Sequence, residues 1–270
     1  MHTIHSPIRS CRFLGAIVAA SISLGLGVSG ALSDELGPDP IAATGWQFES
    51  FMTDLYSVDN IIFSGVGDEI FATLESQSQG RIVRISNGEK VTLVSNLYRP
   101  DGLAYGSPYL YITEEVDDGR VTQLDLRNLS RMVLAKLGGP EGIDFLPDGS
   151  LVVAEDDGGR VLRVTLAGEI EVLVEGLLNP EGLAVSPDGT VYVAETNTGR
   201  ILSIAANGMK TVVEGLNHPD QVEIASDGAL WISEDAKPGR LLRYFSGRLE
   251  VIMAGLMAPQ GIAFGRNGEI

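Results

Sequence analysis

The sequence predicts an all-β protein, a six-bladed β-propeller of four-stranded blades in which the last blade is truncated. Two markers repeat along the chain with a period of 39 or 40 residues. One is a proline that opens each unit, at Pro100, Pro140, Pro180, Pro219 and Pro259. The other is a Gly-Arg pair that ends at Arg81, Arg120, Arg160, Arg200 and Arg240. Outside the N-terminal segment no long stretch has a helical period, so the repeat indicates propeller blades.

Each unit contains four short strands separated by turn residues. In the unit that begins at Pro140, the apolar stretch 142–146 predicts a buried inner strand, followed by a Pro-Asp-Gly turn. Residues 151–154, 160–166 and 169–177 predict the second, third and fourth strands. The predicted blades begin near residues 58, 100, 140, 180, 219 and 259.

The two ends of the repeat array are expected to complete one another. The sixth unit stops at Ile270, where the second strand of a blade would begin. Residues 46–57 precede the first unit, and their WQFESFMT segment aligns with a fourth strand. We therefore expect this strand to close the last blade, and the printed sequence to be a fragment of a longer chain. An open five-bladed array is the alternative, but it would expose strand edges, which proteins usually avoid.

The N-terminus has the pattern of a secretory signal peptide over residues 1–31, followed by a linker over 32–45. Basic residues precede an uncharged run from Phe13 to Ala31, and no acid occurs before Asp34. An uncleaved membrane anchor is the alternative. Cleavage would give an exported protein, periplasmic or extracellular, with no stable membrane insertion.

Composition excludes several classes of protein. Acidic residues outnumber basic ones by 36 to 19, which argues against nucleic acid as a partner. The hydrophobic content of 44% argues against a disordered acidic chain. Cys11 is the single cysteine, so an intrachain disulfide, a CxxC redox pair and a cysteine zinc site are excluded.

The residues that follow the unit-opening prolines predict a functional site. They begin the inner strands at one rim of the channel, at Asp101, Glu141, Glu181, Asp220 and Gln260, with Asp59 as the equivalent in the first unit. Five of these six positions are acids. Two unit charges ~5 Å apart repel by about 3 kcal/mol at an effective dielectric constant near 20. Raised carboxyl pKa values, arginines that reach in, or a bound hard cation such as Ca²⁺ would relieve this repulsion. A structural role at the blade junctions is the alternative.

A second set of acids ends the second strands, at Glu114, Glu155, Glu195 and Glu234. These glutamates are expected to pair with the Gly-Arg arginines and to maintain the repeat. The first unit departs from the pattern, with Leu74 at this position and Glu75 beside it.

The segments NPEGLAVSPDGTVYVAE from Asn179 and RPDGLAYG from Arg99 resemble the senescence-marker-protein/gluconolactonase family of six-bladed propellers, and NHL-type repeats more generally. The resemblance implies a divalent metal in the channel, often calcium. Its ligand positions match Glu181, Asp101 or Asp220, and the nearest counterpart of a further ligand is Asp59. Glu181 replaces an asparagine of the family, and no NDG-type segment is present.

Two functions from different classes follow. The first is an exported, divalent-metal-dependent hydrolase that cleaves a lactone or ester at the channel mouth. Asp59, Asp101, Glu141, Glu181 and Asp220 would form the metal site, and Asp220 and His218 would move protons. His218 has Asn179, Gly139 and Ala258 as counterparts, so an ordinary loop position is its alternative. The second function is a non-catalytic propeller that binds a small-molecule ligand, or a protein partner on its rim.

Overall fold

The computed structural model describes residues 9–14, 40–52, 54–265 and 269–270. Most of the predicted signal peptide (1–8 and 15–31) and most of the linker (32–39) lie outside the described residues. In the described part of the chain, no helix has both the length and the apolar character that a membrane span requires.

Five four-stranded antiparallel sheets form the blades, and each follows the chain order from the inner to the outer strand. The strands are β4 (Val58–Phe63), β5 (Ile70–Leu74), β6 (Gly80–Ser86) and β7 (Glu89–Leu97) in the first blade; β8 (Pro100–Gly106), β9 (Tyr109–Glu114), β10 (Gly119–Asp125) and β11 (Arg131–Leu137) in the second; β12 (Pro140–Phe145), β13 (Leu151–Glu155), β14 (Arg160–Val164) and β15 (Ile170–Glu175) in the third; β16 (Pro180–Val185), β17 (Val191–Glu195), β18 (Arg200–Ala205) and β19 (Gly208–Glu214) in the fourth; and β20 (Pro219–Ile224), β21 (Leu230–Glu234), β22 (Gly239–Phe245) and β23 (Arg248–Leu256) in the fifth.

Three more strands and one short helix complete the described elements. The strand β2 (Ile41–Ala42) adds a fifth strand to the fifth blade by pairing with β23. The strand β1 (Arg9–Leu14) pairs in parallel with β3 (Trp46–Met52). A 3-10 turn, η1 (Thr196–Thr198), follows the second strand of the fourth blade.

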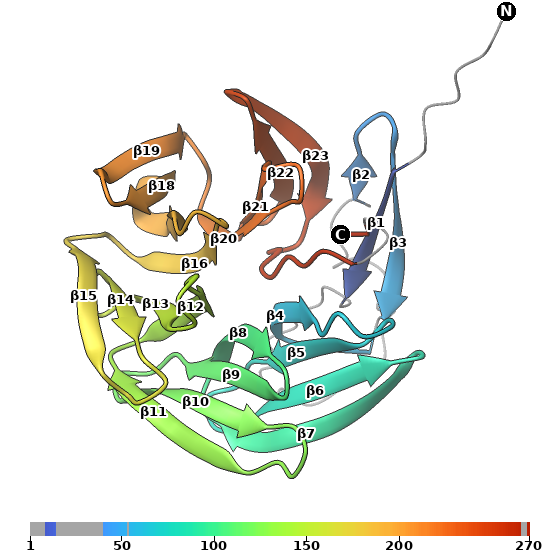
Figure 1. The fold of residues 1–270 in the computed structure, drawn as a ribbon. Helices are drawn as coiled ribbons and strands as arrows, with labels where there is room; N and C mark the ends of the chain where they lie inside the picture. The colour runs from blue at the N-terminus through green and yellow to red at the C-terminus, as the bar shows by residue number, and fades with distance from the viewer. Residues whose placement is uncertain (1–8, 15–39, 53, 266–268) are drawn as a thin grey trace, which may run out of the picture.

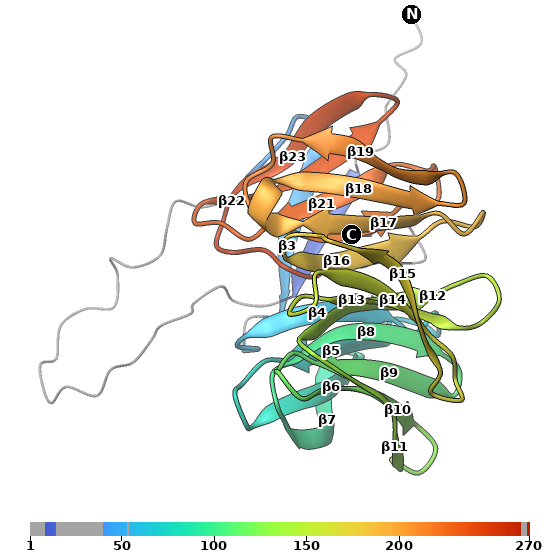
Figure 2. The same ribbon diagram turned by 90° about the vertical axis from the view of Figure 1, so that its left-hand side faces the viewer.

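The prediction of six blades is wrong, because the described residues form five. The blades surround a central axis, and β1 and β3 lie in the remaining sector between β23 and β4 (Figure 1). Seen edge-on, the strands run across the thickness of the ring (Figure 2). The sixth unit supplies only residues after Pro259, and the described ones form no strand. The strand β3, which was expected to close this blade, pairs with β1 instead.

The inner segment of the sixth unit nevertheless occupies the place of an inner strand. Neighbouring inner strands approach one another at a glycine. A Cβ added to Gly102, Gly142 or Gly182 would lie within 2.8 Å of the backbone carbonyl oxygen of the inner-ring acid on the next inner strand. Gly261 has the same relation to the carbonyl oxygen of Asp59, to which its N–H donates a hydrogen bond of 2.7 Å. Neighbouring inner strands thus approach too closely for a side chain, and the same contact joins the sixth unit to the first.

The core consists of apolar clusters between neighbouring blades. One cluster, for example, combines Val152 and Val161 of the third blade with Leu183 and Val193 of the fourth. Trp231 packs edge-on against Trp46 at 5.3 Å and Phe264 at 6.1 Å between ring centroids. The sector without a complete blade therefore shares an apolar contact with the fifth blade, and Trp231 is a packing residue.

Candidate functional site

The junction before each inner strand has one backbone geometry that brings two acids of a blade together. The residue before the proline, or before Val58 in the first unit, has a positive φ between 40° and 57°, at Ser57, Arg99, Gly139, Asn179, His218 and Ala258. In each of the five blades its carbonyl accepts a hydrogen bond from the residue after the second strand, for example from Asp156 N–H to Gly139 at 2.9 Å. The acid that starts the inner strand therefore lies close to the residue that follows the second strand.

The five predicted acids gather at the channel mouth. This inner acid ring consists of Asp59, Asp101, Glu141, Glu181 and Asp220, each the second residue of an inner strand. The pKa values of Asp59, Asp101, Glu141 and Asp220 are raised well above the ordinary range, first by burial and then by the negative charges of neighbouring acids. Burial also raises the pKa of Glu181, to about 7.

The members of the inner acid ring influence one another across the channel. Asp101 experiences the charges of Asp59 and Asp220, which belong to different blades. A hydrogen bond with Glu181 is a further cause that raises the pKa of Asp220. The structure thus places the sequence-predicted acids in a single electrostatic cluster, in which protonation relieves part of the repulsion.

A second set of acids at the mouth was missed by the sequence reasoning. This outer acid tier consists of Glu75, Glu115, Asp156 and Asp235, each the residue after a second strand. Burial raises the pKa of Glu115 to about 7. The fourth blade has Thr196 at this position. The sequence signal in the second, third and fifth blades is a pair of adjacent acids at the end of the second strand, whereas Glu75 of the first blade follows Leu74.

One arginine reaches into the mouth. The Nε of Arg99 lies 2.6 Å from Glu75 Oε1, and its guanidinium also pairs with Glu115. Arg99 occupies the positive-φ position that is glycine or asparagine in the next two units. The arginine therefore compensates acids from two blades, and a long cation at a turn position was the sequence signal.

His218 does not join the acids that it was expected to serve. Its side chain is exposed, and Nδ1 lies 3.0 Å from Asn217 Oδ1. No hydrogen bond among the described residues links it to Asp220. Burial raises the pKa of the nearby Asp235, and Lys237 and His218 only partly oppose that shift. His218 has the positive φ of its counterparts, so its backbone fits the geometry of an ordinary junction.

Two further acids lie on inner strands at positions that the other units fill with apolar residues. Asp144 on β12 accepts hydrogen bonds from the N–H groups of Phe145 and Val185, at 2.7 and 2.8 Å. Glu223 on β20 accepts a hydrogen bond from the Gln221 amide at 3.2 Å. Burial, followed by the charge of Asp144, raises the pKa of Glu223 to about 8. These acids break the apolar inner-strand pattern, a signal that the sequence reasoning also passed over.

The glutamates that end the second strands pair with the Gly-Arg arginines. In the fifth blade, Glu234 accepts hydrogen bonds from two guanidinium nitrogens of Arg240 and from Asn217 N–H at 2.8 Å. The corresponding arginine and amide surround the glutamate in the second, third and fourth blades. These paired glutamates, Glu114, Glu155, Glu195 and Glu234, are buried. Each glutamate therefore connects the second strand of its blade to the loop that precedes the inner strand of the same blade.

The chemistry of the mouth suits a hard cation. Carboxylate oxygens are the ligands that Ca²⁺ prefers, and the inner acid ring offers them together with the Gln260 amide. In the present side-chain positions, however, no group of three or more His, Cys, Asp or Glu residues in the described segments is arranged to hold a metal ion. Ligation would therefore require side-chain rotation at the mouth.

Comparisons with known proteins support the repeat and the fold. Residues 177–202 match the family model for the NHL repeat, and residues 124–164 match the N-terminal model of strictosidine synthase-like proteins. No curated protein matches the sequence. Similar solved structures include a chain from a nidogen/laminin complex, with 20% identity, a TM-score of 0.67 and coverage of 77% of this chain and 85% of that chain.

Two gluconolactonase structures are also similar. One, from Xanthomonas campestris, has 18% identity, a TM-score of 0.67 and coverage of 79% of this chain and 82% of its own. The other, a protein described as a gluconolactonase on family grounds, has 15% identity, a TM-score of 0.65 and coverage of 85% and 87%. At these identities the likeness shows the β-propeller fold alone.

Proposed function

We propose that the acidic channel mouth binds a divalent cation, with Ca²⁺ as the best match, and that the protein is an exported hydrolase of the gluconolactonase type. The observation that carries the proposal is the inner acid ring, in which five partly or fully buried carboxyl groups repel one another. Such a concentration of negative charge favours a bound cation. Asp59, Asp101, Glu141, Glu181 and Asp220 would hold it.

The proposed substrate is a lactone or another small ester. A bound cation would polarise the substrate carbonyl and lower the pKa of a water molecule. Asp220 would take up and return the proton, and its hydrogen bond with Glu181 gives the proton a neighbouring carboxyl. Glu181, with a pKa of about 7, is the adjacent group that can share this proton. The exposed His218 would contribute less to proton transfer than Asp220 and Glu181.

The first experiment measures thermal unfolding of the full chain with millimolar Ca²⁺ and with a chelator. Saturation to 100 times Kd stabilises a protein by about 2.7 kcal/mol, which corresponds to several degrees for a domain of this size. A clear shift that is followed by hydrolysis in a screen of lactones and esters supports the proposal. The absence of a shift with Ca²⁺, Mg²⁺ and Mn²⁺ would overturn it.

A double variant locates the site. Asp101→Asn with Asp220→Asn should abolish the calcium-dependent shift, and it should stabilise the protein in chelator because two mutually repelling acids are neutralised. The matched control is Asp118→Asn, because Asp118 is exposed and pairs with Lys136 at 2.8 Å away from the mouth. An equal calcium-dependent rise in Tm in the double variant and in the control would show that the cation does not bind at the inner acid ring.

The second candidate is a non-catalytic propeller that binds a ligand or a protein partner. It is favoured by the uniformity of the inner acid ring and by the position of His218 outside it. A calcium-dependent shift without hydrolysis of any lactone or ester would favour this alternative.

A further inference from the structure

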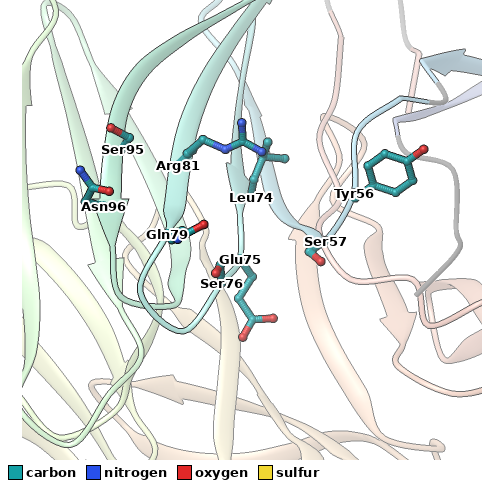
Figure 3. A pocket seen from close by; sticks show the side chains of 9 residues that line it. All are labelled: Tyr56, Ser57, Leu74, Glu75, Ser76, Gln79, Arg81, Ser95 and Asn96. Carbon is teal, nitrogen blue, oxygen red and sulfur yellow. The ribbon is translucent and has the colours of Figure 1, made fainter. Parts of the chain in front are cut away.

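Pockets lie at the same position in the first and third blades. The third-blade pocket, of about 370 Å³, is lined by the paired Glu155 and Arg160, whereas the first-blade pocket has no such pair. The volume of the first-blade pocket is about 530 Å³, within the range of small-molecule sites. Tyr56, Leu74, Ser76, Arg81, Ser95 and Asn96 are among its lining residues (Figure 3). No member of the inner acid ring lines this pocket, and Glu75 is the one member of the outer acid tier that borders it.

The pocket retains the cation of the repeat but lacks its carboxylate. Leu74 faces Arg81 across strands β5 and β6, in the same register in which Glu155 faces Arg160 and Glu195 faces Arg200. In the third blade the arginine pairs with its glutamate. The Leu74 side chain offers no carboxylate to Arg81. The Arg81 guanidinium has no hydrogen bond or ion pair with any described residue.

A backbone donor is left without its acceptor in the same place. The paired glutamates accept hydrogen bonds from the N–H groups of Tyr98, Gly138, Leu178 and Asn217, at 2.8 to 3.1 Å. Tyr56 is the counterpart in the first blade, since it stands two residues before the start of the inner strand. Among the hydrogen bonds of the described residues, none satisfies the Tyr56 N–H.

Glu75 also borders the pocket but does not replace the missing carboxylate. Its side chain pairs with Arg99 at 2.6 Å, and in Figure 3 it points away from Arg81. The remaining lining groups are mainly hydroxyls and amides, such as Ser76, Ser95 and Asn96, which can hydrogen-bond to a polar ligand.

We propose that the first-blade pocket binds the carboxylate group of a small organic acid, which takes the place of the glutamate that the other blades supply internally. The guanidinium of Arg81 would hold the two carboxylate oxygens, as Arg240 holds those of Glu234. The Tyr56 N–H would supply the third hydrogen bond. The size of the pocket leaves room for an organic body beyond the carboxylate.

The test uses acetate as the probe and the full chain in chelator, so that no cation at the channel mouth contributes to binding. Saturation-transfer NMR on the acetate methyl group should detect binding. Arg81→Gln should weaken it at least tenfold, and Leu74→Glu should abolish it by supplying an internal carboxylate. Arg160→Gln is the matched control and should leave acetate binding unchanged, because Arg160 already pairs with Glu155.

A gain-of-site variant keeps the proposal falsifiable if the first-blade variants fold poorly. Glu155→Leu should create a second acetate site, because it leaves Arg160 and the Gly138 N–H without their acceptor. Acetate binding that is unaffected by Arg81→Gln would overturn the proposal, as would the absence of acetate binding to the unaltered chain. Inorganic phosphate that binds this pocket more tightly than acetate would overturn the assignment to a carboxylate.

Discussion

The first and third blades differ at one register pair that the other blades keep constant, Leu74–Arg81 against Glu155–Arg160. In the third blade, Glu155 joins Arg160 to the entering loop through a buried carboxylate. In the first blade, Leu74 faces Arg81, and the pocket beside this pair measures about 530 Å³ against about 370 Å³ beside Glu155 and Arg160. The glutamate therefore acts as an internal ligand that maintains a blade. Departures from the consensus are the places where a blade is free to bind something else.

The largest loss of stability expected from a single substitution comes from removing the paired glutamate of the third blade. Glu155→Leu should destabilise the protein by about 2 kcal/mol, because the half-buried Gly138 N–H and the Arg160 guanidinium lose their acceptor. The expected decrease in Tm is about 4–8 °C. Denaturant titration measures the effect, with Glu171→Leu as the control because Glu171 is 62% exposed. Equal losses in the two variants would mean that the glutamate contributes nothing specific to the blade.

A second comparison concerns the inner strands of the fourth and fifth blades, where Ala184 corresponds to Glu223. The pKa of Glu223 is about 8 in the folded protein and 4.5 in an ordinary glutamate, so the folded state binds the extra proton. Stability from this group is therefore full below pH 4.5 and is lost as the pH rises through about 8. The loss amounts to up to a few kcal/mol. Glu223→Gln should remove this pH dependence and stabilise the protein at pH 8.5.

Chemical unfolding at pH 5.0 and pH 8.5 measures this effect. The matched control is Glu250→Gln, a carboxyl on the outer strand of the same blade that lies near the guanidinium of Arg243. A decline in stability of equal size in the unaltered chain and in Glu223→Gln would assign the pH dependence to the acids at the channel mouth.

The period of the sequence repeat was sufficient to predict the propeller, the strand order within each blade and the gathering of five acids at one rim. It was sufficient because Pro140, Pro180 and their counterparts begin inner strands at a constant period. The blade count was overestimated because repeat counting treated the inner segment after Pro259 as evidence for a whole blade. The segment does occupy an inner position through Gly261, but the other strands of a blade are not built around it in the described residues.

The remaining parts of the site depend on contacts between units, which a period along the chain does not contain. Arg99 pairs with Glu75 of the preceding blade, a contact that only the ring geometry reveals. The pocket beside Arg81 likewise appears only when the register of β5 and β6 is compared with that of β13 and β14. Four residues depart from the repeat consensus: Leu74, Arg99, Asp144 and Glu223. The sequence shows these departures, but it does not show which residues they contact.

A third comparison sets Arg99 against Gly139, which occupies the same junction position one unit later. Arg99→Met should increase the Ca²⁺ affinity of the mouth about three- to tenfold, since it removes a positive charge and releases Glu75 and Glu115. Calorimetric titration measures the change. The control is Arg127→Met, because the Arg127 side chain is 62% exposed and pairs with Asp125 on its own blade. An affinity that does not increase would place the cation outside the reach of this arginine.

The smallest expected effect comes from giving the first blade the glutamate of the others. Leu74→Glu should change the free energy of unfolding by less than about 1 kcal/mol, because two contributions oppose each other. The carboxylate gains Arg81 and the Tyr56 N–H as partners, worth about 1 kcal/mol per hydrogen bond. Against this, Leu74 is only 5% exposed and leaves a cluster with Leu55 and Val83, which costs a similar amount.

A double variant then distinguishes a restored pair from mere tolerance of the substitution. Leu74→Glu combined with Arg81→Gln should be less stable than the sum of the two single variants by about 1–2 kcal/mol, because the buried carboxylate loses its cation. Denaturant titration of the four proteins gives this coupling energy. Additive effects would show that the introduced carboxylate points away from Arg81, and that the first blade differs from the third in backbone shape as well as in one side chain. A coupling of the expected size would mean that the first blade holds the introduced glutamate against Arg81 as the third blade holds Glu155 against Arg160.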